Sequence, residues 1–209
     1  MKIHCDFCGR INEFADGNKD CSCGMKCRSD KLYSAVKNKL TNYSTVFEPQ
    51  THGKIWELLH DTPNYICSAY IDGVESGTIL DGIMIQDLHQ TSFSDSSVDI
   101  IILQDILEHV IDYECVLLEL HRILKVGGSL FISIPIHKHK TRRVAIYDCD
   151  ELVYIDPPEY HDDFGTVQSS LVFTKFGNDI LYEFEDLFGK VEVIPFEFSE
   201  YLLFEVIKC

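Results

Sequence analysis

The chain has few positive charges and no long apolar run. Its 209 residues carry 18 Lys and Arg against 34 Asp and Glu, a formal net charge of −16. A protein that neutralises nucleic-acid phosphates needs clustered Lys and Arg, so this balance argues against a nucleic-acid partner. The apolar stretches fall short of a membrane span, and the first ten residues, MKIHCDFCGR, lack the apolar core of a secretory signal. We therefore expect a cytoplasmic protein without membrane association.

Cysteine is unevenly distributed, because five of the nine lie within the first 27 residues. A reducing compartment favours metal binding over disulfides for such a group. The Cys5-Asp-Phe-Cys8-Gly sequence has the spacing of a zinc knuckle, since two intervening residues let both thiolates face one tetrahedral ion. The second half is less regular, because Cys21-Ser-Cys23-Gly has one intervening residue and Cys27 is a further candidate ligand. The alternative is a loosely ordered segment with reduced, metal-free thiols.

A zinc ion held by four thiolates would be structural, because no coordination position is left for a substrate. A segment this short builds no core of its own, so metal binding would contribute directly to its folding. Leu32, Val36 and Leu40 then recur at helical spacing, which predicts a helix over Ser29–Leu40. We expect a cysteine-rich zinc segment over residues 1–28 and a larger domain over residues 29–209.

An unbroken apolar run from Val98 to Leu103 is typical of a strand covered on both faces, as in a parallel sheet. Ligands of open α/β sheets bind beyond the carboxyl ends of the strands. Gln104 and Asp105 follow this strand directly, so we expect them to face a bound small molecule.

The next helix has clear start and stop signals. Asp112 is suited to cap its first turn, Val116 and Leu120 recur at helical spacing, and Gly127-Gly128 should end it. A second apolar strand over Leu130–Ile134 follows. A strand, a helix and another strand in this order indicate half of a doubly wound α/β domain.

These features share one stretch, DLHQTSFSDSSVDIIILQDILEHVIDYECVLLELHRILKVGGSLFISIP, from Asp87 to Pro135. Its FSDSSVD loop, LEHV segment, helix ending in LKVGG and strand ending in proline resemble the post-core region of class I S-adenosylmethionine-dependent methyltransferases. DPPEYHDDFG and LVFTKFGNDI are similar to the C-terminal part of a bacterial subgroup, of the methyltransferase type 11 kind, that also begins with a cysteine knuckle. The resemblance touches most of the chain and is strong over about half of it. It implies a Rossmann-like, doubly wound, mostly parallel seven-stranded sheet with an antiparallel C-terminal hairpin.

The first strand is expected over Ser44–Glu48. In the resembled family this strand leads into a glycine-rich turn that lets the backbone approach the methionine part of the cofactor. This chain departs from that pattern, because EPQTHG, residues 48–53, has a single glycine. The resemblance implies that Glu48 meets the ammonium group of S-adenosylmethionine, with Pro49 and Gln50 beside it. The alternative for Glu48 is a solvent-exposed turn acid.

Two further acids fall at strand ends. The second strand, Tyr65–Ile71, ends at Asp72, and a carboxylate there in a Rossmann-like fold accepts hydrogen bonds from both ribose hydroxyls. The third strand, Ile83–Gln86, leads into Asp87 and Leu88, which by resemblance face the adenine amino group and cover the ring. The alternative for each acid is a turn-forming Asp without a ligand.

Two apolar runs, Val191–Phe198 and Tyr201–Ile207, predict a closing antiparallel hairpin. Between Ile136 and Gly177 lies a long stretch of weak periodicity. Long irregular connections in compact domains tend to be lids or binding loops, so we expect this one to contact substrate.

Methyl transfer is an in-line displacement on a sulfonium, so the enzyme mainly aligns the nucleophile and excludes water. A hydroxyl acceptor benefits from a base, and His109 near the cofactor or His161 on the long loop could serve. The alternatives are a packing role for His109 and, for His161, a tie to a neighbouring carboxylate. 

The sequence favours an S-adenosylmethionine-dependent methyltransferase acting on a small-molecule or saccharide-type acceptor, with a structural zinc ion. A catalytically silent scaffold and a zinc-dependent interaction protein are the alternatives.

Overall fold

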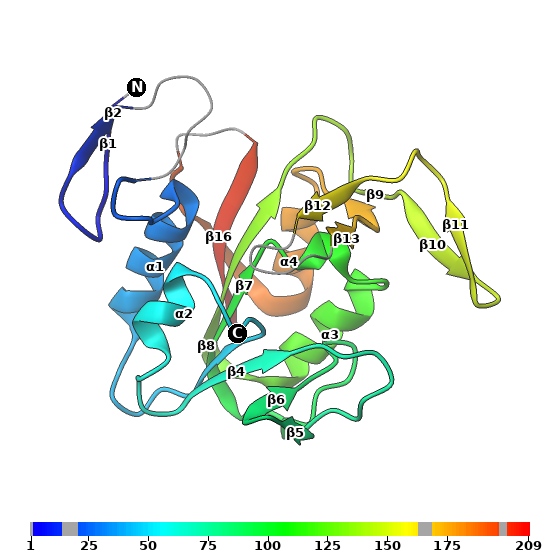
Figure 1. Ribbon diagram of the computed structural model, residues 1–209, viewed down its shortest axis with the longest axis horizontal. Helices are drawn as coiled ribbons and strands as arrows, with labels where there is room; N and C mark the ends of the chain where they lie inside the picture. The colour runs from blue at the N-terminus through cyan, green and yellow to red at the C-terminus, as the bar shows by residue number, and fades with distance from the viewer. Residues whose placement is uncertain (1, 14–20, 163–168, 197–199) are drawn as a thin grey trace.

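A computed structural model describes residues 2–13, 21–162, 169–196 and 200–209. Five parallel strands in the order β8-β7-β3-β4-β6 form the centre of an eight-stranded sheet (Figure 1). β16 and β15 continue it antiparallel beyond β8, and β5 pairs antiparallel with β6 at the other edge. These strands are β3 (Val46–Glu48), β4 (Tyr65–Ala69), β5 (Ile79–Leu80), β6 (Ile83–Ile85), β7 (Val98–Gln104), β8 (Leu124–Pro135), β15 (Gly189–Val193) and β16 (Tyr201–Lys208). The Rossmann-like sheet predicted from the sequence is confirmed.

Helices cover both faces of this sheet (Figure 1). The side chains of β7 alternate between two cores: Ile100 and Ile102 pack with α1 and α2, whereas Ile101 and Leu103 pack with α3 and α4. This double burial is the reason for the unbroken apolar run in the sequence. The helices are α1 (Cys27–Lys39), α2 (Lys54–Leu59), α3 (Tyr113–Ile123) and α4 (Ile180–Phe188), with a 3-10 turn, η1 (Leu107–His109), between β7 and α3.

The boundaries of α3 agree with the sequence at one end only. Asp112 caps the helix, because its side chain accepts a hydrogen bond from the Cys115 N–H at 3.2 Å. The helix ends at Ile123 rather than at Gly127-Gly128, and β8 starts at Leu124. Gly127 has a φ of 78° inside this strand, where the pairing with β7 shifts register. The glycines therefore form an irregularity within β8, not the end of the helix.

The sheet has one strand more than the seven predicted. The additional strand is the two-residue β5, which forms a hairpin with β6. Its turn residues, Asp81 and Gly82, have φ values of 49° and 80°, the left-handed pair that a tight two-residue hairpin requires. The Asp-Gly pair was the available signal in the sequence, but two residues are too few to show alternation.

The C-terminal hairpin is confirmed, with β15 antiparallel to β16 and β16 antiparallel to β8. β16 matches the predicted range to within one residue, whereas β15 begins at Gly189 and ends at Val193, earlier than predicted. Phe198, the predicted end of this strand, lies outside the described residues.

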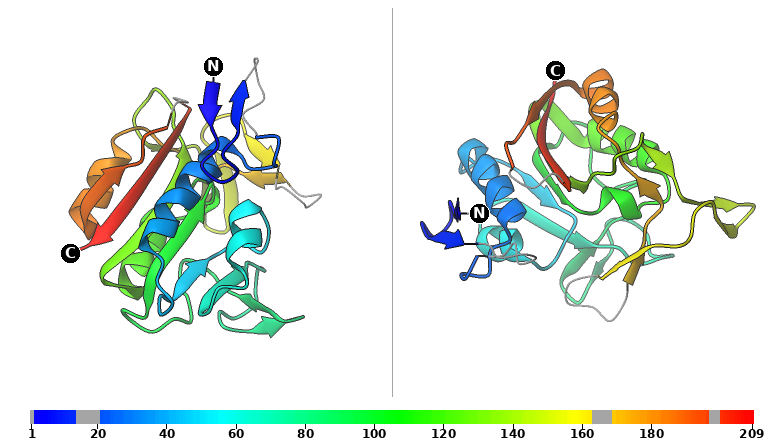
Figure 2. Two further views of the ribbon diagram at one scale, coloured as in Figure 1. Left: turned by 90° about the vertical axis from the view of Figure 1, so that its left-hand side faces the viewer. Right: turned by 90° about the horizontal axis from the view of Figure 1, so that it is seen from above.

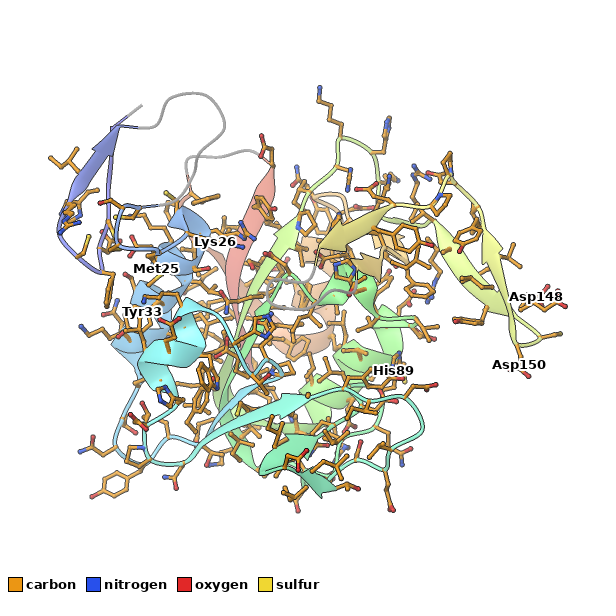
Figure 3. All side chains as sticks on the ribbon, in the orientation of Figure 1. Met25, Lys26, Tyr33, His89, Asp148 and Asp150 are labelled. Atoms are coloured by element: carbon orange, nitrogen blue, oxygen red, sulfur yellow. The ribbon has the colours of Figure 1, made fainter. Side chains whose placement is uncertain are left out.

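The segment 136–177 is not an irregular loop. Its described part contains three two-stranded pairings, and β10–β11 projects from the body as a hairpin (Figures 1 and 2). Figure 3 shows Asp148 and Asp150 at its tip, where Cys149 and Asp150 have φ values of 48° and 68°. A tight turn without glycine or proline explains why the sequence pattern missed it. The strands are β9 (Arg142–Arg143), β10 (Ala145–Asp148), β11 (Glu151–Tyr154), β12 (Tyr160–Asp162), β13 (Ser169–Leu171) and β14 (Thr174–Lys175).

The cysteine segment lies against the N-terminal end of α1 and against α2. It begins with the hairpin β1 (Lys2–His4) and β2 (Ile11–Glu13). Met25, labelled in Figure 3, is fully buried just before α1. It packs with the buried Cys5 and Cys21 and with Leu58 of α2. In the parts of the chain that the structure describes, no helix combines the length and apolar character needed to cross a membrane.

Candidate functional site

A cavity of about 630 Å³ opens beyond the carboxyl ends of β3 and β7. Gln50 and Gly53 line it from the turn after β3, and Gln104 and Asp105 line it from the end of β7. Gly53 is the single glycine of its turn and has a φ of 100°, a conformation that other residues rarely adopt. The cavity is large enough for a small organic ligand and lies where open α/β sheets bind one.

Glu48 lies behind this cavity. Its side chain has no exposed surface; Tyr65 donates a hydrogen bond to Oε2 at 2.5 Å, and Gln104 Nε2 donates to Oε1 at 2.8 Å. Burial raises the pKa of Glu48 to about 7, although both hydrogen bonds act in the opposite direction. Glu48 is not among the residues that line the cavity, so its predicted contact with the cofactor's ammonium group stays a prediction. The alternative of an exposed turn acid is wrong for this residue.

Arg28, at the start of α1, holds Asp105. The Arg28 Nη2 atom lies 2.6 Å from Asp105 Oδ2, and Nε donates to the same oxygen at 2.7 Å. Ser133 donates to Oδ1 at 2.8 Å, and the Arg28 guanidinium lies 4.5 Å from the centre of the Tyr201 ring. The cysteine-rich end of the chain thus supplies a cation to the cavity wall. This ion pair could not be predicted from sequence patterns, because Arg28 and Asp105 are distant in the chain.

The far wall carries Glu108, His109 and His161. Glu108 is 1% exposed, and neither of its carboxylate oxygens accepts a hydrogen bond from the described residues. Burial, and after it the negative charge of Asp105, raises the pKa of Glu108 to about 8. The His109 and His161 rings meet edge to face with centroids 5.0 Å apart. The structure therefore brings both predicted catalytic histidines together at Glu108, a carboxylate to which no role could be assigned from sequence patterns.

The remaining predicted cofactor residues lie along the same edge of the sheet, after β4 and β6. Asp72 accepts a hydrogen bond from the Tyr70 hydroxyl at 3.3 Å, and Asp87 Oδ1 accepts from the His89 N–H at 2.9 Å. Burial raises the pKa of the Tyr70 hydroxyl, and the negative charges of Asp72 and Asp87 raise it further. Both carboxylates therefore lie near the Tyr70 ring. Leu88 is 8% exposed and packs in the core. None of these three residues, nor the half-buried Pro49, lines the cavity.

Four of the five predicted metal ligands form one cluster. The Sγ atoms of Cys5, Cys8, Cys21 and Cys23 lie within 4.8 Å of one another, with Cys5–Cys23 at 3.9 Å and Cys8–Cys21 at 3.5 Å. Four thiolates at about 2.3 Å from a tetrahedral zinc ion lie about 3.8 Å apart, so the arrangement fits that ion. Cys27 is buried at the start of α1 and is not part of the cluster.

Asp30 attaches this cluster to α1. Its carboxylate accepts hydrogen bonds from the N–H groups of Asp6 and Phe7 at 2.7 and 2.8 Å, and from the Cys5 thiol at 3.6 Å. Burial raises the pKa of the Cys5 thiol, which makes its deprotonation costly. A cation bound by the cluster would have to offset this cost, because metals bind the thiolate form.

Comparison with known proteins identifies the fold. Residues 68–132 match a family model described as a methyltransferase domain. A ubiquinone biosynthesis O-methyltransferase of Vibrio atlanticus is 26% identical over 115 residues, which are 55% of this chain and 48% of that protein. The chain therefore spans about half the length of this curated relative.

Two solved structures share the arrangement of the sheet and helices. The 1,6-didemethyltoxoflavin-N1-methyltransferase of Burkholderia thailandensis, with bound 1,6-didemethyltoxoflavin and S-adenosylhomocysteine, has a TM-score of 0.52 and 13% identity, covering 85% of this chain and 76% of that one. The PH0226 protein of Pyrococcus horikoshii OT3 has a TM-score of 0.52 and 14% identity, covering 87% and 90%. These likenesses establish a Rossmann-like methyltransferase fold.

Proposed function

We propose that this protein is an S-adenosylmethionine-dependent methyltransferase. The observation that carries the proposal is the cavity at the carboxyl ends of β3 and β7, in a fold shared with a structure that holds S-adenosylhomocysteine. The match of residues 68–132 to a methyltransferase domain supports it, because that range contains Asp72, Asp87, Gln104 and Asp105.

The cofactor would lie along the carboxyl edge of the sheet. In this proposal Asp72 accepts hydrogen bonds from the ribose hydroxyls, and Asp87 faces the adenine amino group. The methionine part occupies the cavity beside Gln50 and Gln104, where the Gly53 turn permits a close approach of the backbone. Glu48 acts through Gln104, whose side chain it orients by the 2.8 Å hydrogen bond.

The acceptor is proposed to be a small molecule or saccharide with a reactive hydroxyl group. The curated relative named above is an O-methyltransferase, which favours oxygen as the acceptor atom. In the transfer, an oxygen lone pair forms the bond to the methyl carbon, and the methyl–sulfur bond breaks with its electrons left on sulfur. The hydroxyl proton must leave as well. We propose that the acceptor oxygen lies against Glu108, His109 and His161, and that these groups promote this loss.

The cysteine cluster is proposed to bind a structural zinc ion through Cys5, Cys8, Cys21 and Cys23. The support is the fit of their separations to tetrahedral thiolate ligation. Through Asp30 and Arg28 the loaded cluster would fix the start of α1 and thereby one wall of the cavity. Reduced cysteines of this kind are expected in the cytoplasm.

Activity is tested with zinc-loaded protein and S-adenosylmethionine carrying a tritiated methyl group, against a panel of catechols, phenols and saccharides. The expected result is label in at least one acceptor with stoichiometric S-adenosylhomocysteine. Asp72→Ala and Asp87→Ala should lower kcat/KM for the cofactor at least tenfold. Cofactor binding without transfer to any hydroxyl compound would contradict the acceptor class, and absence of cofactor binding would leave the silent scaffold as the better account.

A further inference from the structure

Glu108, His109 and His161 form a second cluster of metal-ligand type, separate from the cysteines. One ligand atom from each lies within 4.8 Å of the others. Glu108 Oε1 is 3.7 Å from His109 Nε2 and 3.9 Å from His161 Nδ1. Ligands about 2.1 Å from one ion lie roughly 3 to 3.5 Å apart, so side-chain shifts of about 1 Å would complete the site.

Both histidines are oriented from behind. His109 Nδ1 lies 2.9 Å from the carbonyl oxygen of Leu171, and His161 Nε2 lies 3.2 Å from Glu159 Oε1. Carbonyl and carboxylate oxygens only accept, so these nitrogens carry the proton in the neutral rings. The nitrogen that faces Glu108 is then, in each ring, the one with the lone pair. Metal-binding histidines are held in this way by an acceptor on the opposite nitrogen.

The turn η1, which carries Glu108 and His109, is held in place by residues 171–173. The Phe173 N–H donates to the Glu108 carbonyl at 2.8 Å, and Leu171, on the same segment, accepts from His109. His161 comes from β12 itself. The two histidines are therefore brought together by backbone contacts.

Glu108 supplies the independent sign of a ligand. Its carboxylate is almost completely buried, lines the cavity, and accepts no hydrogen bond within the described residues. A buried polar group without partners is costly, and such a group in a native structure calls for an ion, a proton or a water. Three lone-pair donors that converge on one point favour a cation there.

We propose that Glu108, His109 and His161 bind a first-row divalent transition-metal ion. One carboxylate and two imidazoles suit such ions, whereas the four thiolates of the cysteine cluster suit the softer zinc–sulfur chemistry. Three protein ligands leave coordination positions open toward the cavity. If the protein is the methyltransferase proposed above, an acceptor hydroxyl binds at an open position, where the ion lowers the pKa of the hydroxyl and fixes its oxygen for attack.

The site is tested by titrating Co²⁺ into full-length protein whose cysteine cluster has been loaded with one equivalent of Zn²⁺. We expect one further equivalent to bind, with visible d–d absorption and without the charge-transfer band of a cobalt–thiolate bond. Glu108→Gln and His161→Ala should each weaken this binding at least tenfold. His52→Ala is the matched control, because His52 lines the same cavity but does not belong to the cluster. The affinity of this variant for Co²⁺ should stay within about twofold of the wild-type value.

Either of two results would overturn the site: no second equivalent in the wild type, or retained affinity in both ligand variants. A cluster that holds only a proton would give the first result. Circular dichroism and retained zinc at the cysteines show that each variant is folded. Glu108→Gln is the variant least expected to disturb the fold, because it keeps the side-chain shape and removes a buried charge. S-adenosylhomocysteine calorimetry on the same samples separates the two proposals, because cobalt binding without cofactor binding would leave the metal site standing and remove the methyltransferase.

Discussion

Glu48→Gln should remove a pH-dependent loss of stability that burial of this carboxyl group imposes on the fold. Glu48 is fully buried beneath Tyr65 and Gln104, and burial raises its pKa from 4.5 to about 7. The folded chain therefore binds more protons than the unfolded chain between these values. The contribution of Glu48 to the free energy of unfolding is fully present below pH 4.5, falls as the pH rises from 4.5 to about 7, and is lost above that value.

The size of the effect follows from the two pKa values. At about 1.4 kcal/mol for each pH unit between 4.5 and about 7, Glu48 lowers the free energy of unfolding by about 3 kcal/mol on going from pH 4 to pH 8. Glutamine has nearly the same shape, accepts and donates hydrogen bonds, and does not titrate. The difference in free energy of unfolding between Glu48→Gln and the wild type should therefore shift by about 3 kcal/mol in favour of the variant between pH 4 and pH 8.

The assay is urea unfolding at pH 4 and pH 8, followed by the fluorescence of Trp56, the single tryptophan. Comparison of the two proteins at each pH cancels the carboxylates they share. If the difference in unfolding free energy between the two proteins is the same at both pH values, the prediction is wrong, because Glu48 would then titrate as an exposed acid.

Three further outcomes are expected. Phe184→Ala should lower the free energy of unfolding by about 3–5 kcal/mol, because the Phe184 ring is fully buried and its centroid lies 4.9 Å from that of Phe204. Tyr182 lies on the same helix but is 71% exposed, so Tyr182→Ala should change the free energy of unfolding by less than about 0.5 kcal/mol in the same urea experiment. A strong chelator, or Cys8→Ser, should lower the Tm in scanning calorimetry and reduce zinc measured by mass spectrometry; an unchanged Tm with zinc removed would contradict a structural role. Burial acts to raise the pKa of Glu119, but hydrogen bonds from Arg122 and Thr91 outweigh it and lower this pKa. The ionised Glu119 therefore stabilises the fold above the pKa it has in the unfolded chain, and this stabilisation is lost as the pH falls. Glu119→Gln should flatten the acid side of a curve of unfolding free energy against pH, and an unchanged curve would argue against these contacts.

Features of the fold that depend on neighbouring residues were predictable from the sequence. The run Val98–Leu103 shows its double burial directly, because β7 alternates between two cores. Asp112 is a cap whose partner is three residues away. The helix end was predicted wrongly, because Gly127-Gly128 signals a backbone irregularity without saying whether a helix or a strand contains it.

Features that depend on distant pairing were not predictable. The six short strands between β8 and α4 form two-residue to four-residue pairings whose periodicity is too brief to detect. The Arg28–Asp105 ion pair and the meeting of His161 with Glu108 join segments far apart in the chain. Sequence patterns could rank His109 and His161 as candidates, but only the tertiary structure supplies the buried carboxylate between them. The roles of Asp72, Asp87 and Leu88 in cofactor binding stay predictions.

Calorimetric titration of zinc-loaded protein with S-adenosylhomocysteine should show whether the carboxyl edge of this sheet binds the cofactor. We expect one site per chain with micromolar affinity, weakened at least tenfold in Asp72→Ala and in Asp87→Ala. Glu75→Ala, which changes a turn acid between them to which no role is assigned, should bind like the wild type. Folded protein that shows no heat of binding, or binding that both substitutions leave unchanged, would rule out a cofactor site at this edge of the sheet.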